Sequence, residues 1–152
     1  MEPIDAAHEI LDTMLGYLGF AVTIQPDDNH PGCGLQVLTS EPKPLIGRQG
    51  ERLDDIQYLV NRLLQLRIPD APRIWVDVDH YRATQEFRTL EEADRLAERV
   101  VATGKPAKLP PMNSYYRRLI HHHFADHPGV KTWSPTDSAK VKRITIQPRS
   151  EG

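Results

Sequence analysis

The stretch LIGRQGERLDDIQYLVNRLLQL, residues Leu45–Leu66, predicts a glycine loop that leads directly into a helix. In its second part, apolar residues recur at steps of three and four, as they do in an amphipathic helix. These residues are Leu53, Ile56, Leu59, Val60, Leu63 and Leu64. A helix that begins after Gly50 directs its free amide groups and the positive end of its dipole toward the loop, so an anion can bind there.

The tetrad Gly47-Arg48-Gln49-Gly50 suits a phosphodiester backbone, because two glycines allow unusual dihedrals and leave no side chain in the way. Many G-x-x-G tetrads are merely turns. Here an apolar pair precedes the tetrad, a positive charge lies inside it and a long helix follows it, and this combination resembles the GXXG element of a KH domain. That element clamps about four nucleotides of single-stranded RNA or DNA. The nucleic-acid-binding residues implied are Ile46, Gly47, Arg48, Gln49, Gly50 and Arg52.

The length of 152 residues, with 39% hydrophobic residues, allows one ordinary domain or two very small ones. No apolar run approaches the roughly 18 to 20 residues of a membrane span, and the N-terminus lacks the basic and apolar regions of a signal peptide. We therefore expect no membrane span and a cytoplasmic location. The single cysteine excludes an intramolecular disulfide.

Charge is distributed unevenly along the chain, although the net charge is only -2. Residues 1–41 carry seven acidic residues and no lysine or arginine. Residues 99–152 carry ten basic and three acidic residues, which leaves a surplus of seven positive charges before any histidine is counted. A basic region of this kind favours a nucleic-acid partner for the second half of the chain, although differently charged solvated faces are the simpler alternative.

Local patterns predict the elements around the glycine loop. Residues 4–18 have the apolar spacing of a helix, and residues 20–24 and 35–39 are β-prone segments separated by a turn-rich loop. Residues 73–78 alternate apolar and polar side chains, as in a strand with one buried face. The order helix, strand, strand, glycine loop, helix, strand resembles a KH domain of the second topological type at residues 1–79.

The remaining chain predicts a second domain at residues 80–152. A long helix at 80–104, with Phe87 and Val101 among its apolar positions, leads to a short strand at 105–109, a helix from Tyr115 to His127 and two strands at 130–133 and 141–146. His123 belongs to the predicted buried face of the Tyr115 helix. The predicted fold class is α+β: a type II KH domain joined by a long helix to a small α/β domain.

The Tyr115 helix carries a second candidate site. Arg117 and His121 are four residues apart, so their Cβ atoms lie about 6 Å apart on one face and both side chains can reach one phosphate. Arginine supplies a permanent forked charge, and a histidine near its ordinary pKa gains charge when a phosphate stabilises the imidazolium. Such pairs are common on helix surfaces. The full set of candidates in this half is Arg117, Arg118, His121, His122, Lys142 and Arg143.

Residues 76–134, VDVDHYRATQEFRTLEEADRLAERVVATGKPAKLPPMNSYYRRLIHHHFADHPGVKTWS, resemble the bacterial Jag family, whose members are also called SpoIIIJ-associated proteins, KhpB or EloR. In this family a KH domain precedes an Arg-x-x-x-His domain that binds single-stranded nucleic acid. Arg117 and His121 occupy the signature positions, and LPPM, the helix and the V-x-T strand follow the family pattern. Members commonly carry a further N-terminal domain and linker that this sequence does not show, and residues 134–140 replace an acidic, proline-containing loop.

The resemblance implies a non-catalytic protein that binds single-stranded RNA, or single-stranded DNA, as a post-transcriptional regulator linked to cell elongation or envelope processes. One alternative is an adaptor that pairs with a small KH-domain protein. A metal-dependent nuclease is the weaker alternative, because adjacent histidines point about 100° apart around a helix and His121, His123 and His127 cannot converge on one ion. We therefore expect no catalytic residue, cofactor or metal.

Overall fold

The computed structural model describes residues 1–150 and has an α+β fold. Its residue contacts divide the chain into two compact units, one from Met1 to Arg82 and a second that begins at Ala83. The first unit contains α1 (Pro3–Tyr17), β1 (Thr23–Pro26), β2 (Gly34–Leu38), α2 (Pro42–Ile46), the 3-10 turn η1 (Arg48–Gly50), α3 (Glu51–Arg67) and β3 (Trp75–Val78). Of the helices at residues 1–150, none is both long and apolar enough to cross a membrane.

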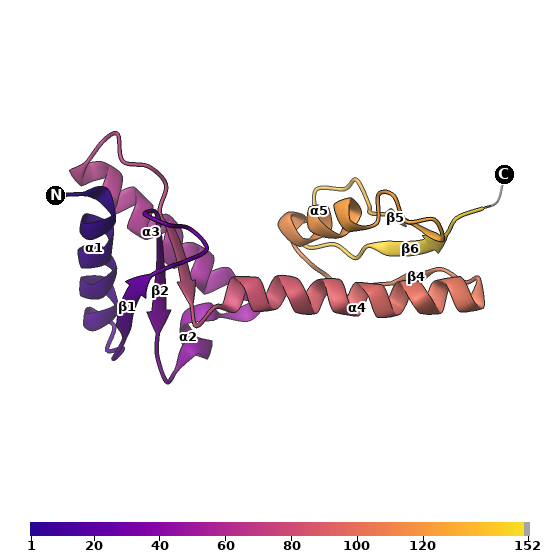
Figure 1. Cartoon of the computed structure of the whole chain (residues 1–152), viewed down its shortest axis with the longest axis horizontal. Coiled ribbons are helices and arrows are strands. Elements are labelled where there is room, and N and C mark those ends of the chain that lie inside the picture. Colours follow the sequence, from indigo (N-terminus) through magenta and orange to yellow (C-terminus); the bar gives the residue numbers. More distant parts are fainter. Residues whose placement is uncertain (151–152) are drawn as a thin grey trace. The chain divides into compact units, whose positions relative to one another are not determined.

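The sheet of the first unit has the order β1-β2-β3. β1 is antiparallel to β2, with Thr23 opposite Leu38, and β2 is parallel to β3, with Gly34 opposite Trp75. The helices α1 and α3 lie against one another and cover the sheet (Figure 1). Their shared core includes Leu11 and Leu15 of α1, Leu53, Val60 and Leu64 of α3, and Leu35, Val37, Val76 and Val78 of the strands.

The buried face of α3 differs from the predicted stripe. Leu59 and Leu63 are 47% and 43% exposed, whereas Gln57 is buried. β3 is an edge strand, so its outer backbone groups need partners from outside the sheet. The Gln57 side chain accepts a hydrogen bond from the backbone amide of Val76 at 2.9 Å. Apolar spacing predicted the wrong stripe because a polar residue, Gln57, occupies the buried face, where it pairs with the edge of β3.

Asn61 of α3 makes a similar contact with Ile74, the residue just before β3. Its side-chain nitrogen donates to the carbonyl oxygen of Ile74 at 2.8 Å, and its side-chain oxygen accepts from the amide of Ile74 at 2.8 Å. One amide side chain therefore replaces a neighbouring strand at this residue. The helix that follows the glycine loop is fixed to the sheet both by apolar burial and by these polar contacts.

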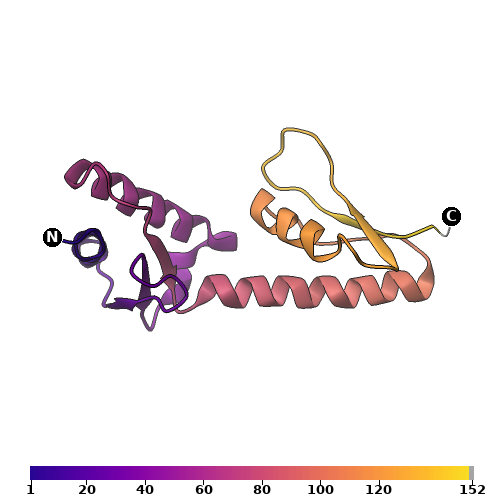
Figure 2. The ribbon, with the colours of Figure 1, turned by 45° about the horizontal axis from the view of Figure 1, so that its top comes forward.

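The second unit contains most of α4 (Tyr81–Thr103), then β4 (Ala107–Lys108), α5 (Ser114–His123), β5 (Val130–Trp133) and β6 (Thr145–Pro148). Its sheet has the order β4-β6-β5 with both pairs antiparallel. A long connection links β5 to β6 and stands beside α5 (Figure 2). The core is formed by Ala93, Ala97 and Val100 of α4, Leu109, Ile120 and Phe124, and Val130, Ile144 and Ile146.

Several predicted boundaries in the second unit are wrong. The last strand begins at Thr145 instead of Val141, and residue 142 makes only an isolated bridge with Met112. Pro110 and Pro111 explain the interruption, because proline has no amide hydrogen with which to continue a ladder. The helix predicted to reach His127 ends at His123, where single turns follow.

Three side chains that were predicted to lie on the apolar faces of their helices are exposed instead. Phe87 and Val101 of α4 are exposed. His123 is also exposed, and its Nε2 lies 2.8 Å from the carboxylate of Asp94. The buried residues of α4 form a narrow stripe of Thr89, Ala93, Ala97 and Val100, and Phe87 and Val101 lie outside it.

Candidate nucleic-acid interface

The glycine loop connects α2 to α3 through left-handed backbone conformations. Gly47 has φ 71°, Gln49 has φ 55° and Gly50 has φ 82°. The amide of Gly47 donates to the carbonyl oxygen of Lys43 at 3.0 Å, which ends α2, and Gly50 is the N-cap of α3. Left-handed values are easy for glycine and uncommon for glutamine. The loop therefore depends on its two glycines and places a strained residue between them.

Limited space adds to backbone conformation in favouring glycine at both ends of the loop. A Cβ atom added to Gly47 would lie 2.8 Å from Cγ of Arg52, and one added to Gly50 would lie 3.1 Å from Cε1 of Tyr81. The Tyr81 ring thus packs directly against Gly50 of the loop. Partial burial and then the negative charge of Asp54 raise the pKa of the Tyr81 hydroxyl, so the ring is uncharged at neutral pH.

The charged residues of the loop differ in what they contact. Arg48 and Gln49 are exposed. Arg52 is exposed too, but its Nη1 donates to the carbonyl oxygen of Pro44 at 3.0 Å and so holds the turn before the loop. Ile46 is partly buried against the core of the unit. All six candidates lie in one short segment, in which Arg52 is bonded to a carbonyl oxygen and Arg48 is exposed to an incoming phosphate.

Arg117 lies near the start of α5, which is capped by the Asn113 side chain accepting from the amide of Tyr116. Nη1 of Arg117 donates to the carbonyl oxygen of Met112 at 2.7 Å and to that of Lys140 at 3.3 Å. Arg117 does not occur among the ion pairs of the described residues. Its positive charge is therefore held in place by carbonyl groups and is not neutralised by a carboxylate.

His121 lies one turn further along α5 and faces β5. Its Nδ1 is 2.5 Å from Oγ1 of Thr132, and its Nε2 is 3.2 Å from Oγ of Ser134. Partial burial, and then the positive charge of Arg117, lower the pKa of the His121 ring. Without a bound anion the ring therefore favours its neutral form. In this state it can exchange hydrogen bonds with hydroxyl groups or with a polar ligand.

The other candidates of this half lie in three places. The Lys142 side chain is 11% exposed, and its Nζ donates to the carbonyl oxygens of Pro135 at 3.0 Å and Asp137 at 2.5 Å. Arg117, His121 and Lys142 thus all contact the connection formed by residues 134–140. Arg118 and His122 are exposed on α5, and Nε of Arg143 donates to the carbonyl oxygen of Leu109 at 2.9 Å.

Two residues of this site were not identified from the sequence. Thr132 and Ser134 orient the His121 ring, although they lie 11 and 13 residues away. Thr132 was visible only as part of the V-x-T strand, in which it shares a sheet face with the buried Val130. Among residues 1–150, no three His, Cys, Asp or Glu side chains are grouped so that they would hold a metal ion.

Comparison with known proteins places this geometry in a family context. Residues 88–148 match the R-3-H domain family. This match covers the greater part of α4 and all elements from β4 to β6, and it includes Arg117, His121 and the hydroxyl groups that hold them. The candidate site on α5 therefore lies within the segment that matches the R-3-H domain.

Relatives that match most of the chain carry the name RNA-binding protein KhpB. The chain is 33% identical to the protein from Clostridium symbiosum over 120 residues, which cover 77% of this chain and 54% of that protein. It is 28% identical to the Streptococcus pneumoniae serotype 2 (strain D39 / NCTC 7466) protein over 127 residues, covering 84% and 39%. The Bacillus subtilis (strain 168) protein is 25% identical over 137 residues, covering 88% and 65%.

These alignments are longer than either unit, so the similarity extends over both. The chain spans about half the length, or less, of the first two relatives. The R-3-H domain match and the shared name of the relatives support the Jag family, which the sequence resembles.

Proposed function

We propose that the chain binds single-stranded RNA without catalysis, through the Gly47–Gly50 loop and the Arg117–His121 face of α5. In this proposal residues 1–79 form a KH domain of the second type. Residues 80–152 form the Arg-x-x-x-His domain, of which 151–152 lie outside the described residues. The observation that carries the proposal is the similarity over both units to proteins named RNA-binding protein KhpB.

The geometry of the first unit supports a KH assignment. Its element order is helix, strand, strand, helix, helix, strand, with β2 and β3 parallel and the glycine loop between its second and third helices. The loop has glycine-dependent conformations at both ends and an exposed arginine between them. This arrangement suits contact with a sugar–phosphate backbone, because the nucleic acid can approach the main chain at Gly47 without meeting a side chain there, whereas Gly50 is buried beside Tyr81.

The geometry of the second unit supports a phosphate contact by Arg117. Two carbonyl oxygens fix its guanidinium, and its charge has no carboxylate partner among the ion pairs of the described residues. Each site alone supplies few contacts, and mainly electrostatic contacts of this kind give affinities on the order of micromolar or weaker. Two sites in one chain raise the effective concentration for the second contact.

The glycine loop is tested by the double substitution Arg48→Asp with Gln49→Asp. Aspartate tolerates the left-handed conformation of residue 49, so we expect the fold to persist and most binding to a single-stranded RNA pool to disappear. The matched control is Arg62→Asp with Gln65→Asp, the same changes at exposed positions later in α3. Fluorescence anisotropy measures binding, and circular dichroism checks folding. Unchanged binding of the loop variant would show that the loop is only a turn.

Arg117→Ala tests the second site through salt dependence. If Arg117 contacts one phosphate, the slope of log affinity against log salt falls by about 0.7 for a single strand. Arg149→Ala is a matched control, because Arg149 also donates to two carbonyl oxygens, those of His127 at 2.6 Å and Ala125 at 3.1 Å. Equal slopes for Arg117→Ala and the wild-type protein would exclude a phosphate role for Arg117.

The cellular role that we propose is post-transcriptional regulation linked to cell elongation or envelope processes. An adaptor that pairs with a small KH-domain protein is the second candidate, and exposed apolar side chains on α3 favour it. Tyr58 and Leu66 are 67% and 72% exposed. Cross-linking in cells separates the two functions: recovered RNA supports the binding protein, whereas recovery of proteins alone supports the adaptor.

A further inference from the structure

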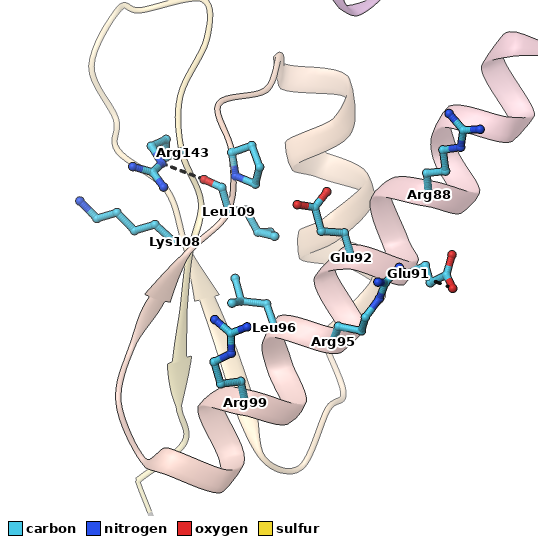
Figure 3. Close-up of a pocket in the computed structure, with 10 residues that line it drawn as sticks. Arg88, Glu91, Glu92, Arg95, Leu96, Arg99, Lys108, Leu109 and Arg143 are labelled. Atoms are coloured by element: carbon cyan, nitrogen blue, oxygen red, sulfur yellow. Dashed lines mark hydrogen bonds and ion pairs between the residues drawn. The ribbon is translucent and has the colours of Figure 1, made fainter.

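A cavity of about 720 Å³ lies in the second unit between α4 and the chain that follows β4 (Figure 3). Its lining contains five cationic residues and two acidic ones, a surplus of three positive charges. The cations are Arg88, Arg95, Arg99, Lys108 and Arg143. Apart from Arg143, none of them belongs to the candidate site on α5. We call this cavity the α4 groove.

Helical spacing explains why three arginines gather along the α4 groove. Arg88, Arg95 and Arg99 are separated by seven and four residues, so they share one face of α4 at steps of about 10 Å and 6 Å along its axis. Arg95 pairs with Glu91 at 3.6 Å. Arg88, Arg99, Lys108 and Arg143 do not occur in the ion pairs of the described residues. Four cations of the groove thus retain charge that can bind an anion.

The base of the α4 groove is apolar. Leu96 points from α4 toward β4 and the residues that follow it, and Leu109 is buried beside it, as Figure 3 shows. Arg99 extends from α4 toward β4, while Arg143 and Lys108 lie on the side of the groove opposite α4. Apolar surface between separated cations suits a ligand with alternating charged and uncharged parts, such as the phosphates and sugars of a nucleic-acid strand.

Two short segments connect the α4 groove to the candidate site on α5. Arg143 is bonded to the carbonyl oxygen of Leu109, and Leu109 donates its amide to the carbonyl oxygen of Ile144 at 2.9 Å. A few residues further on, Met112 and Lys142 exchange backbone hydrogen bonds at 2.9 and 3.1 Å, and Met112 accepts from Arg117. Residues 109–112 and 142–144 therefore border both places.

We propose that the α4 groove binds backbone phosphates of the same single-stranded RNA that the Arg117 site contacts. This inference rests on the proposed function and extends it from one phosphate-binding site in the second unit to two. The shared segments favour RNA over an acidic protein segment, because a strand held at Arg117 can pass along residues 142–144 to Arg143 and Lys108. Arginine forks and a lysine then bind successive phosphates.

The test is the double substitution Arg99→Gln with Lys108→Gln in the full chain. Both side chains are exposed, so the fold should persist. Loss of two phosphate contacts should lower the salt slope of oligouridylate binding by about 1.4 and weaken binding about tenfold or more at low salt. The matched control is Lys105→Gln with Lys131→Gln, which removes the same charge from exposed residues of the same unit that do not line the groove.

Glu92→Gln should change RNA affinity in the opposite direction. Its carboxylate lines the α4 groove and should repel a phosphate, so neutralising it should tighten RNA binding about twofold at low salt. If the Arg99/Lys108 variant and the Lys105/Lys131 control have the same salt slope, this inference is overturned while the proposed function stands. An Arg99/Lys108 variant that loses binding to a polyglutamate peptide while its RNA slope is unchanged would overturn it too. Wild-type protein that does not bind oligouridylate would overturn the proposed function, and this inference with it.

Discussion

The two candidate sites are constructed in different ways. The Gly47–Gly50 loop is defined by backbone conformation within four consecutive residues, and a Cβ atom would lie 2.8 Å from Arg52 at its first glycine and 3.1 Å from Tyr81 at its last. The Arg117–His121 site is defined by side-chain hydrogen bonds that come from residues 112 to 140. The first is a local site, whereas the second exists only when a helix, a strand and a loop have come together.

This difference determines how each site should respond to substitution. A local backbone site fails when one atom is added, because strain and crowding act at the same residue. A site held by several hydrogen bonds should lose its geometry in steps, because the remaining bonds still restrain the side chains. Substitution of a loop glycine should therefore have a larger effect than removal of one hydrogen bond at His121.

Gly50→Ala should destabilise the first unit by about 1–3 kcal/mol. An alanine at φ 82° is strained, and its Cβ would lie 3.1 Å from the Tyr81 ring, so strain and crowding add. Urea unfolding measures the loss in a Trp133→Phe background, where Trp75 reports on the first unit alone.

Two other glycines separate the contributions to that loss. Gly19 has φ 87° with no atom near an added Cβ, so Gly19→Ala measures backbone strain alone. Gly16 lies in α1 with open space around it, and Gly16→Ala should stabilise by about 0.5–1 kcal/mol. A loss at Gly50 no greater than the loss at Gly19 would show that the Tyr81 ring moves aside freely.

The contrast also explains how much of the molecule could be predicted from sequence. The elements of the first unit and the place of the glycine loop follow from apolar spacing and from glycine, which are local signals. The buried Gln57 could not be predicted, because its role depends on β3 being an edge strand, and strand order is a property of the whole fold. The interruption before Thr145 depends likewise on Pro110 and Pro111 in a different segment.

For the second candidate site, sequence spacing predicts the position of the side chains on the helix but not their partners. Helical spacing alone placed Arg117 and His121 on one face of α5. The hydroxyl partners of His121 come from β5 and the residue after it, and the spacing of α5 contains no information about them. For the same reason the spacing of α5 could not predict that burial by other segments lowers the pKa of His121.

Thr132→Val should destabilise the second unit by about 0.5–1.5 kcal/mol, less than the loss at Gly50. Valine has nearly the shape of threonine and favours a strand, so the loss reports the hydrogen bond to Nδ1 of His121. Unfolding followed through Trp133 in a Trp75→Phe background measures it. Thr136→Val makes the same chemical change at an exposed position of the β5–β6 connection and should change stability little. Equal values for the two variants would contradict a structural role for the Thr132 hydroxyl.

The smallest expected effect is a pH dependence that resides in His121 and has no counterpart in the glycine loop. The folded-state pKa of His121 is lowered, so between that pKa and the ordinary value the unfolded chain binds more protons than the folded one. Stability from this residue should therefore rise with pH across this window and be lost as pH falls through it. The urea midpoints of His121→Gln and wild-type protein, compared near pH 5.5 and pH 7.5, test this; His122→Gln, at the adjacent exposed position, is the control. Bound RNA should reduce the effect, because a phosphate near the ring favours its protonated form. A wild-type pH dependence in His121→Gln would assign the effect to another group.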